Sequence, residues 1–519
     1  MSDTTAAFDA SLVDESGQLA KDTNWWGAFV IGLSGTVLVL PLVPYTTFLF
    51  GPFQVALYLS LTAIGVFLCY CLAELATSMP DKTGGLPAYA FETFKPLGKG
   101  ASTHIGGLSS WGYWLGWFAV APINVLIAAS IIISLFDLPL GRVFDPFGVT
   151  IGAPTTTTFF LVGAVLLLVA FIPCYLGIRL GARFATILGV ACMVPLVLLI
   201  VMPLIKLGET DFGRALSFNF EPTAGWTGTT LSFTLVISWV FIYTWTVLAM
   251  EAAACYVAEC RDPVRDAKIA MTAEGLFGFF VYAALPIMLL AVLTTADLEA
   301  FGVEEFGGSS ALFFQTYTEK LFGNSVFWEW FVGLTLIAAL LLSVLNAVMG
   351  CARGLFQNSR DGILPRFFGK VNRHGVPSVA MGFNLVASLT LLLIGNPLDI
   401  YIFSNVGYLF AVAVSLIGYW LYRVKQPEAS RPFSLGSWAA PVALIIGVFF
   451  LFAWGYGGYF AADYQVAADK RILFFIGLFL LALWFPLYGW RQMENKRLGT
   501  SFYHRVESGS AKEEAGSNQ

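Results

Sequence analysis

The stretch Gly32-Leu33-Ser34-Gly35-Thr36 interrupts the first long apolar segment of the chain, which runs from about residue 27 to residue 50. That segment is long enough to cross a lipid bilayer as a helix. Backbone groups that a break frees at mid-depth cannot face lipid, so they must lie buried in protein or line a cavity. A broken first helix near the bilayer midplane is typical of transporter binding sites. The alternative is close packing, because small residues let two membrane helices approach each other.

The composition is that of a membrane protein. Of the 519 residues, 57% are hydrophobic and only 12% are charged, which excludes a soluble domain. Twelve apolar stretches of about 20 residues follow one another, which predicts an all-α membrane protein with twelve transmembrane helices. They are centred near Val37, Ala63, Phe118, Leu166, Pro195, Trp239, Tyr282, Ala339, Ala387, Ala411, Val448 and Leu478. The first stretch follows about 24 polar residues without a charged segment and a cleavage site, so it is not a signal peptide.

The Lys and Arg residues predict the orientation. All but six of the 28 fall in one alternate set of loops and tails. The exceptions are Arg142, Lys206, Arg214, Lys320, Lys470 and Arg471. Because positively charged loops stay in the cytoplasm, both termini are expected to be cytoplasmic and the number of helices even. We expect a multi-pass protein of the plasma (inner) membrane that contacts membrane lipid.

The Cys and His residues do not predict a metal or redox site. The seven cysteines lie within the apolar stretches or at their cytoplasmic ends, so no disulfide framework is expected. The three histidines are scattered, which speaks against a metal centre. The chain has no nucleophile–base set, metal cluster or phosphate loop. We therefore predict no enzyme activity, no cofactor and no nucleic-acid partner.

The sixth apolar stretch, from Ser232 to Val257, is the second unusual one. Its segment Tyr243-Thr244-Trp245-Thr246-Val247-Leu248-Ala249-Met250-Glu251 places a carboxyl inside an apolar run. An ionisable group at that depth is unfavourable and by default suggests function. Stretches one and six are five helices apart, so they hold equivalent positions if helices 1–5 and 6–10 are corresponding halves. This pairing predicts an inverted-repeat secondary transporter.

Other polar and aromatic residues have structural explanations. Glu74 is expected to be a buried partner for a loop cation or an interfacial carboxylate, and Glu274 lies toward the cytoplasmic end of the seventh stretch. Pro122 and Asn124 are placed to bend the third helix toward a cavity. Aromatic residues in the first half of that helix are expected to form an interfacial belt. They are Trp111, Tyr113, Trp114 and Trp117.

Three motifs stand near the cytoplasmic ends of the stretches. The first is Ala73-Glu74-Leu75-Ala76 followed by Gly84-Gly85-Leu86-Pro87-Ala88-Tyr89. The second is Met250-Glu251-Ala252-Ala253-Ala254, followed by Glu259 and Arg261-Asp262-Pro263. The third is Ser359-Arg360-Asp361-Gly362-Ile363-Leu364-Pro365. In these motifs and their order, the chain resembles the amino acid–polyamine–organocation (APC) superfamily over about residues 27 to 422.

The resemblance implies the arrangement of the twelve helices. The first ten form a five-plus-five inverted repeat in which helices 1 and 6 are broken, and two extra helices follow at the C-terminal end. The expected parts are a cytoplasmic N-terminal tail (1–24), the first repeat with helices 1 to 5 (25–205), the second repeat with helices 6 to 10 (230–424), helices 11 and 12 (436–490), and a cytoplasmic C-terminal tail (491–519).

The resemblance also implies a substrate site between broken helices 1 and 6. In the family, the first break reads Gly-Ser-Gly and its backbone amides take a substrate carboxylate, as a helix N-terminus does. Here Ser34-Gly35 match, and Leu33 replaces the first glycine. Trp245 matches an aromatic gate that shields a bound ammonium by cation–π attraction, and the alternative is a core tryptophan. The implied substrate-site residues are Ile31, Gly32, Ser34, Gly35, Thr36, Tyr113, Ala121, Thr244, Trp245, Thr246, Leu248, Ala249, Asn346 and Ser404.

The coupling ion is left open by the fifth helix. Many members of the superfamily carry a coupling lysine there, but this chain has none between Phe184 and Leu204, and Cys192 stands at the matching position. This leaves exchange, a proton carried by Glu251 or by the substrate, or a sodium site lined by hydroxyls such as that of Ser343. We expect proton coupling or exchange, with Glu251 as the coupling residue.

The predicted function is secondary active transport of a small amino acid or a related amine by alternating access. The break in helix 1 holds no acidic residue, which argues against a polyamine with several charges. A polyamine or ethanolamine-type amine permease is the first alternative, and a non-transporting membrane receptor or subunit with the same fold is the second. The last two helices carry no polar residue that marks a site, so they are expected to pack in the membrane or to form a homodimer surface.

Overall fold

The computed structural model describes residues 21, 23–144, 155–223, 226, 228–301, 308–394, 397–464 and 471–497. In these ranges the chain folds into helices, and isolated bridges pair Thr23 with Cys260 and Val143 with Thr156. The prediction of an all-α protein is therefore confirmed for the described residues. Most of the predicted tails, 1–24 and 491–519, lies outside them, although residues 491–497 belong to the last helix.

The helices follow one another with short connections. In the first half of the chain they are α2 (Trp25–Thr36), α3 (Val39–Phe50), α4 (Phe53–Ser78), α5 (Leu86–Thr93), η1 (Lys95–Leu97), α6 (Lys99–Phe118), α7 (Val120–Leu135), α8 (Thr157–Tyr175), α9 (Ile178–Val201), η2 (Met202–Glu209) and α10 (Phe212–Ala215). In the second half they are α11 (Phe233–Val247), η3 (Ala249–Glu259), α12 (Pro263–Val292), α13 (Thr295–Phe301), α14 (Gly308–Phe322), α15 (Val326–Arg360), η4 (Arg366–Gly369), α16 (Ser378–Leu391), α17 (Pro397–Lys425), α18 (Ala439–Phe452), η5 (Ala453–Gly457), α19 (Gly458–Phe460), η6 (Ala461–Tyr464), α20 (Ile472–Ala482) and α21 (Trp484–Arg497).

Eleven helical segments among the described residues are long and apolar enough to cross a membrane, so this is a multi-pass membrane protein. They are Trp25–Phe50, Phe53–Ser78, Lys99–Leu135, Thr157–Tyr175, Ile178–Gly208, Phe233–Glu259, Pro263–Val292, Val326–Arg360, Pro397–Lys425, Ala439–Tyr464 and Ile472–Arg497. Helix α16, with 14 residues, is shorter than these segments. It lies between the eighth and the ninth of them, where the sequence predicts a further span.

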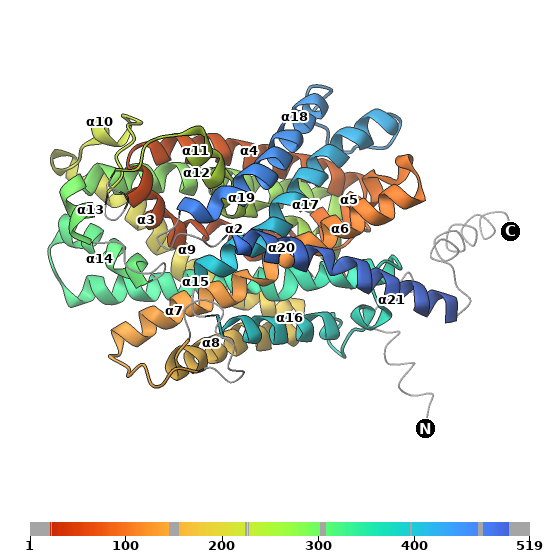
Figure 1. The fold of residues 1–519 in the computed structure, drawn as a ribbon, viewed down its shortest axis with the longest axis horizontal. Coiled ribbons are helices and arrows are strands. Elements are labelled where there is room, and N and C mark those ends of the chain that lie inside the picture. The colour runs from red at the N-terminus through yellow and green to blue at the C-terminus, as the bar shows by residue number, and fades with distance from the viewer. Residues whose placement is uncertain are drawn as a thin grey trace.

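The spans divide into an inner and an outer set. Their long helices share one general direction, and α15 runs along most of the molecule (Figure 1). In the most apolar part of the first span 89% of the residues are buried, and in the sixth and eighth spans 83%. In α8, which packs beside α16 along one edge of the bundle, only 28% are buried (Figure 1). The broken spans therefore lie inside, and α8 presents its apolar surface outward.

The first span breaks at Val37 and Leu38, between α2 and α3. The sequence predicted the break within residues 32–36, but α2 continues through them, so the break lies a few positions later than predicted. Pro41 explains the difference, because it has no N–H to donate to the carbonyl of Val37. The N–H of Leu40 donates to that carbonyl instead, at 3.1 Å, which tightens the turn.

The sixth span changes its helix type where the sequence predicts a break. Helix α11 ends at Val247, and η3 continues as a 3₁₀ helix of 11 residues with Glu251 in its first turn. Runs of 3₁₀ helix longer than about 4 residues are uncommon, and inside a longer helix they often mark a hinge. The span is therefore wound more tightly beyond Leu248 and is not opened into a loop, in keeping with the absence of glycine there.

The third span bends at Ala119, between α6 and α7. Pro122 cannot donate to the carbonyl of Phe118, four residues earlier, and the hydroxyl of Ser388 lies 3.5 Å from that carbonyl instead. The bend predicted from Pro122 is thus present, and a neighbouring helix supplies a replacement for the missing bond.

The interfacial belt predicted for the third span is wrong, because its aromatic residues are buried. The indole N–H of Trp111 donates to the carbonyl of Leu480 at 2.8 Å, and that of Trp114 donates to the side-chain oxygen of Asn384 at 2.5 Å. A buried indole needs an acceptor, and here the surrounding helices provide it. These side chains therefore fasten α6 to the interior of the bundle.

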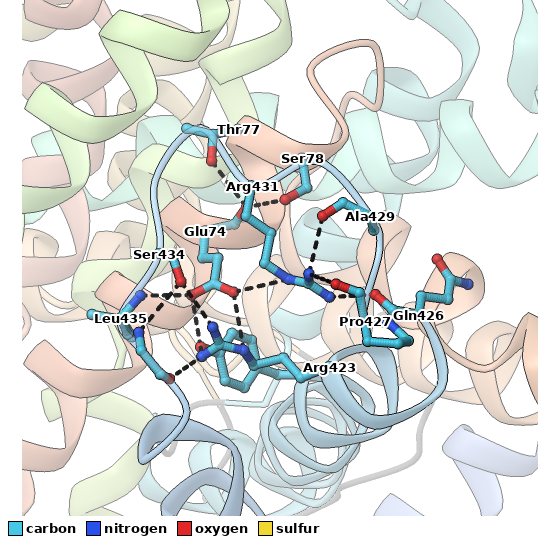
Figure 2. Close-up of polar contacts among 12 residues, drawn as sticks. Glu74, Thr77, Ser78, Arg423, Gln426, Pro427, Ala429, Arg431, Ser434 and Leu435 are labelled. Carbon is cyan, nitrogen blue, oxygen red and sulfur yellow. Dashed lines mark hydrogen bonds and ion pairs between the residues drawn. The ribbon is translucent and has the colours of Figure 1, made fainter.

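Glu74, in the last turns of α4, holds the segment that follows α17. One carboxylate oxygen lies 3.3 Å from Arg423 Nε and 3.4 Å from Arg431 Nε, so the carboxylate stands between two guanidinium groups (Figure 2). The other oxygen accepts from the Tyr419 hydroxyl at 2.8 Å and from the Leu435 N–H at 2.9 Å. Of the two interpretations of Glu74, the buried partner of a cation is confirmed.

Candidate functional site

The breaks of the first and sixth spans lie against each other. A Cβ atom on Gly35 would stand 1.9 Å from the carbonyl oxygen of Ala249, and one on Gly32 would stand 2.8 Å from the Cβ of Ala253. No side chain larger than hydrogen fits at Gly35. The small residues of the first span therefore bring its end into direct contact with the start of η3, as the packing interpretation of this stretch predicts.

Tyr282 of α12 connects the two breaks. Its hydroxyl lies 2.8 Å from the carbonyl oxygen of Gly35 and 2.7 Å from that of Thr246. Each of these carbonyls belongs to the last two residues of a helix, where the regular backbone bonds run out. The buried phenol of Tyr282 thus lies between the ends of helices α2 and α11.

Glu251 is held by three hydrogen-bond donors. Its carboxylate accepts from the Tyr113 hydroxyl at 3.3 Å, from the Trp117 indole N–H at 3.1 Å and from the Tyr408 hydroxyl at 3.3 Å. The Tyr113 hydroxyl also lies 3.1 Å from the sulfur of Cys255. Glu251 is fully buried and takes part in none of the ion pairs among the described residues. The sixth span is thereby joined to α6 and α17 through one carboxyl.

Trp245 lies at the start of this region and is fixed on two sides. Its ring packs against that of Tyr401 with the centroids 4.2 Å apart and the planes tilted by 56°, and its indole N–H donates to the carbonyl of Gly116 at 3.2 Å. The Tyr401 hydroxyl lies 2.9 Å from that of Thr246 and donates to the carbonyl of Ile242 at 2.5 Å. Trp245 therefore spans from α11 to both α6 and α17.

Other predicted residues, which come from several spans, are buried and form no hydrogen bond to Glu251 in the described structure. Thr244 donates to the carbonyl of Phe241 at 2.8 Å, and Ser404 donates to that of Tyr401 at 3.0 Å, so both hydroxyls bond within their own helices. The apolar members lie in the interior, and they are Ile31, Ala121, Leu248 and Ala249.

Two predicted residues carry buried polar atoms with no hydrogen-bond partner among the described residues. They are the hydroxyl of Ser34 and the side-chain nitrogen of Asn346. The side-chain oxygen of Asn346 accepts from the Tyr256 hydroxyl at 2.6 Å. Buried groups of this kind are the usual contacts of a polar ligand. Ser343, the candidate for a sodium site, donates to the carbonyl of Leu340 at 2.6 Å.

Thr36 points to a different neighbour from the rest of the predicted set. Its hydroxyl donates to Glu274 of α12 at 2.7 Å, and both side chains are fully buried. The structure thus separates Thr36 from the Glu251 cluster and pairs it with a second carboxyl.

Leu33 fills space beside the fifth span. Its Cδ1 would lie 3.8 Å from a Cβ on Gly189, and the sulfur of Cys192 lies 3.6 Å from the carbonyl of Gly189. Leu33, which replaces the glycine of the superfamily motif, therefore packs on α9, the helix in which this chain has no coupling lysine.

The three sequence motifs meet at one end of the bundle. The N–H of Gly84 donates to the carbonyl of Cys255 at 3.3 Å. Gly84 and Gly85 have φ of +91° and +65°, which only glycine adopts readily, and a Cβ on Gly85 would lie 2.9 Å from the backbone of Ala254. A Cβ on Gly84 would lie 3.2 Å from Gly354. We call this end, where residues 82–89, 254–261 and 353–361 meet, the motif end.

A network of ion pairs connects charged residues at the motif end. Lys82 Nζ lies 2.7 Å from Glu92 and 3.4 Å from Asp361, and Lys95 lies 2.6 Å from Glu92. Burial alone would lower the pKa of Lys82, but Asp361 and Glu92 outweigh it and raise that pKa above its ordinary range. Burial alone would raise the pKa of Glu92, but Lys82 and Lys95 outweigh it and lower that pKa. For Asp361 burial prevails over the attraction of Lys82, and the pKa is raised.

Four residues at the breaks were not among the predicted substrate-site residues. They are Trp117, Tyr282, Tyr408 and Glu274. Each places a polar atom inside an apolar span, and such an atom needs a partner when it is buried. A polar side chain inside an apolar stretch is visible in the sequence, but the sequence does not show which group it bonds to.

Comparisons with known proteins agree with this architecture. A family profile described as "Amino acid permease" matches residues 24–482. The chain is 23% identical to an uncharacterized transporter of Legionella pneumophila over 418 residues, which cover 76% of this chain and 80% of that protein. It is 25% identical to an arginine/ornithine antiporter of Pseudomonas aeruginosa over 329 residues, which cover 62% of this chain and 60% of that protein. It is 23% identical to the branched-chain amino acid permease BcaP of Lactococcus lactis over 438 residues, which cover 82% and 86%.

Proposed function

This chain belongs to the amino acid permease family, and on that premise we propose that it is a secondary active transporter for a small amino acid or a related amine, working by alternating access. The observation that carries this proposal is the direct contact of two interrupted spans, with Gly35 against Ala249 and the Tyr282 hydroxyl between the carbonyls of Gly35 and Thr246. Interrupted spans at corresponding positions are the usual binding site of inverted-repeat transporters.

The proposed topology has twelve membrane-spanning helices. Helix α16 is taken as the twelfth crossing, between the eighth and the ninth of the eleven longer segments. Residues 25–205 and 230–424 are taken as the two inverted repeats, and residues 436–490 as the two further helices. The excess of Lys and Arg in alternate loops supports a cytoplasmic motif end and cytoplasmic termini in the plasma membrane.

The helix ends at the breaks suit a zwitterion. Helix α3 begins at Val39, so its positive dipole end lies at the first break and attracts a carboxylate. Helices α2 and α11 end at Thr36 and Val247, so their negative ends lie nearby and attract an ammonium. Trp245, two residues before the end of α11, and the neighbouring ring of Tyr401 supply aromatic faces near that helix end. An amino acid that carries both charges fits this arrangement.

The electrostatics favour a substrate with one ammonium group over a polyamine. Glu251 is the carboxyl nearest to Trp245 in the sequence, and its oxygens already accept three hydrogen bonds. The names of the relatives, an arginine/ornithine antiporter and a branched-chain amino acid permease, define the substrates to be tested first. Glu251 is proposed to carry or sense a proton during the cycle, with exchange as the other mode of coupling.

Counterflow in proteoliposomes tests the function. Proteoliposomes that contain the purified protein are loaded with one compound at a time. The panel contains branched-chain amino acids, arginine, ornithine, ethanolamine and putrescine. We expect saturable counterflow of at least one amino acid or monoamine. Counterflow of putrescine alone would support the polyamine alternative, and the absence of saturable counterflow for the whole panel would support a non-transporting receptor or subunit.

A glycine pair provides the matched control. Gly35→Ala places a methyl group against the Ala249 carbonyl and should force the two breaks apart, so counterflow should be lost. Gly100→Ala adds the same methyl group at a helical position with no atom within 4 Å, and counterflow should persist. Equal activity of the two variants would show that the contact between the breaks is not needed for transport.

A further inference from the structure

We propose that Glu274 is a proton-binding carboxyl that couples proton movement to the opening and closing of the first break, an inference that rests on the transporter function proposed above. Glu274 lies on α12, outside the sequence motifs and outside the Glu251 cluster. The ligand of this site is a single proton, and the residue is a coupling residue that does not itself bind the amino acid.

The geometry places Glu274 at the end of α2. One carboxyl oxygen accepts from the hydroxyl of Thr36, the last residue of α2, at 2.7 Å. The other oxygen is fully buried and has no hydrogen-bond partner among the described residues. Glu274 also takes part in none of the ion pairs that the described residues form. A carboxyl with one free oxygen thus faces the segment that is proposed to move.

The other buried glutamates show what an ionised carboxyl requires in this protein. Glu74 has Arg423 and Arg431, Glu259 has Arg353, and Glu251 has three donors. Glu274 has the single hydroxyl of Thr36. A buried carboxylate with so little compensation is strongly disfavoured, so the neutral acid is the form that suits this site.

The neighbours of Glu274 leave the proton as the matching ligand. The titratable groups around it are the Cys69 thiol from α4, the Tyr282 phenol on its own helix and, further away, Glu251 from η3. Gly275, the next residue, packs against Cys69, since a Cβ there would lie 3.5 Å from the Cys69 Cβ. In the described ranges, Glu274 belongs to no group of three or more Asp, Glu, His or Cys side chains that could hold a metal ion.

The coupling step follows from this placement. In the closed arrangement the Glu274 carboxyl is neutral, with the proton on one oxygen and the Thr36 hydroxyl donating to the other. When the first break moves, the Thr36 bond is lost and water reaches the carboxyl, which releases the proton as H⁺ to that side and becomes a carboxylate. The carboxylate takes up one proton from the opposite side only after the site has opened to that side, and the neutral acid then re-forms the Thr36 bond as the break closes. No other bond forms or breaks.

The test separates transport from its proton coupling. Wild type, Glu274→Gln, Glu251→Gln and the exposed control Glu329→Gln are reconstituted, and counterflow without a gradient is compared with substrate accumulation driven by an imposed pH gradient. We expect the wild type and Glu329→Gln to show both. Glu274→Gln should retain measurable counterflow, while its accumulation under a pH gradient falls to that of protein-free liposomes.

Each other outcome overturns one of two distinct claims. Three results would overturn the role of Glu274. The first is accumulation by Glu274→Gln equal to that of wild type, and the second is loss of pH-driven accumulation in Glu251→Gln alone. The third is wild-type accumulation that depends on a sodium gradient or does not depend on the pH gradient. Absence of counterflow in the wild type would instead overturn the transporter function itself.

A second pair of variants covers misfolding of Glu274→Gln. Thr36→Val removes only the hydroxyl that Glu274 contacts, and its accumulation under a pH gradient should be lost. Thr36→Ser keeps a hydroxyl at that position and should restore the accumulation. Equal accumulation under a pH gradient in Thr36→Val and Thr36→Ser would overturn the proposed contact between the proton site and the first break.

Discussion

Arg353 and Glu259 form an ion pair that solvent does not reach, with side-chain exposures of 0% and 3%. Two guanidinium nitrogens contact the two carboxylate oxygens, and a third donates to the carbonyl of Met349 at 3.1 Å. The guanidinium also lies 5.2 Å from the ring centre of Tyr256. The pair therefore fastens the end of the sixth span to the eighth span at the motif end.

Arg353→Met should destabilise the protein strongly, because it leaves the Glu259 carboxylate buried without its partner. Breaking a buried pair in this way is expected to lower the free energy of unfolding by about 3–5 kcal/mol. The loss should appear as a lower thermal unfolding midpoint of the purified protein in detergent. Arg265→Met, at an exposed arginine near the start of α12, is the control and should leave the midpoint nearly unchanged.

The double variant Arg353→Met/Glu259→Met distinguishes charge from packing. It removes both charges together, so it should recover most of the stability that Arg353→Met loses. If the double variant lost as much free energy of unfolding as the two single variants lose together, the two charges would not compensate each other.

Trp245→Ala should cripple transport while leaving membrane insertion intact. The change removes the ring that packs against Tyr401 and the N–H that donates to the carbonyl of Gly116. Loss of an aromatic face over a bound ammonium should weaken substrate binding roughly tenfold or more. Trp245→Phe keeps a ring without the N–H and should lose less. Uptake by Trp245→Ala at the wild-type rate would make Trp245 a core residue.

Glu251→Gln should change the pH dependence of transport. The carboxylate offers acceptor sites to Tyr113, Trp117 and Tyr408 together, whereas the amide turns one end into a donor. At least one of the three contacts must therefore break or reverse, and the group can no longer exchange a proton. The measurement is the rate of counterflow between about pH 5 and pH 8. Superimposable profiles would leave Glu251 with a structural role.

Lys82→Met should reduce stability in a pH-dependent manner. The raised pKa of Lys82 means that its contribution is present at neutral pH and disappears only above its ordinary value of 10.5. The lowered pKa of Glu92 means that its contribution is present above its ordinary value of 4.5 and is lost as the pH falls further. The difference between wild type and Lys82→Met should be about 1 kcal/mol at neutral pH and should shrink in acid.

Unfolding midpoints across this pH range check the Lys82 prediction. Lys425→Met, at an exposed lysine, should show no such trend. A difference between wild type and Lys82→Met that stays constant from pH 7 to below 4.5 would contradict the assigned role of Glu92.

The fold class could be predicted because it depends on local composition. Apolar runs of sufficient length predict membrane helices wherever they pack, and Glu251 in such a run marks the sixth span without any knowledge of its neighbours. Pro122 likewise marks the bend of the third span, since a missing N–H acts within one helical turn. The buried role of Glu74 was one of two predicted interpretations, and the structure decided between them.

The partners of these residues could not be predicted, because packing between distant segments chooses them. Glu251 meets Tyr408, which lies 157 positions away, and Thr36 meets Glu274, which lies 238 positions away. Trp117 was assigned to an interfacial belt from its place near a helix end, but its helix lies in the interior. The position of the first break depended on the missing N–H of Pro41, a signal that the nearby glycines obscured.

The Tyr282 hydroxyl has one hydrogen and two carbonyls within reach, those of Gly35 and Thr246. Each carbonyl also accepts from a backbone N–H, that of Leu38 for Gly35 and that of Leu248 for Thr246, so the single phenol hydrogen adds a second bond to one of them at a time. A separation of the two broken spans would leave the phenol on one of the two carbonyls until the spans return. The phenol therefore chooses between two helix ends, and the carbonyl that it leaves keeps its backbone donor but has its second lone pair open to water or to the ammonium of a substrate.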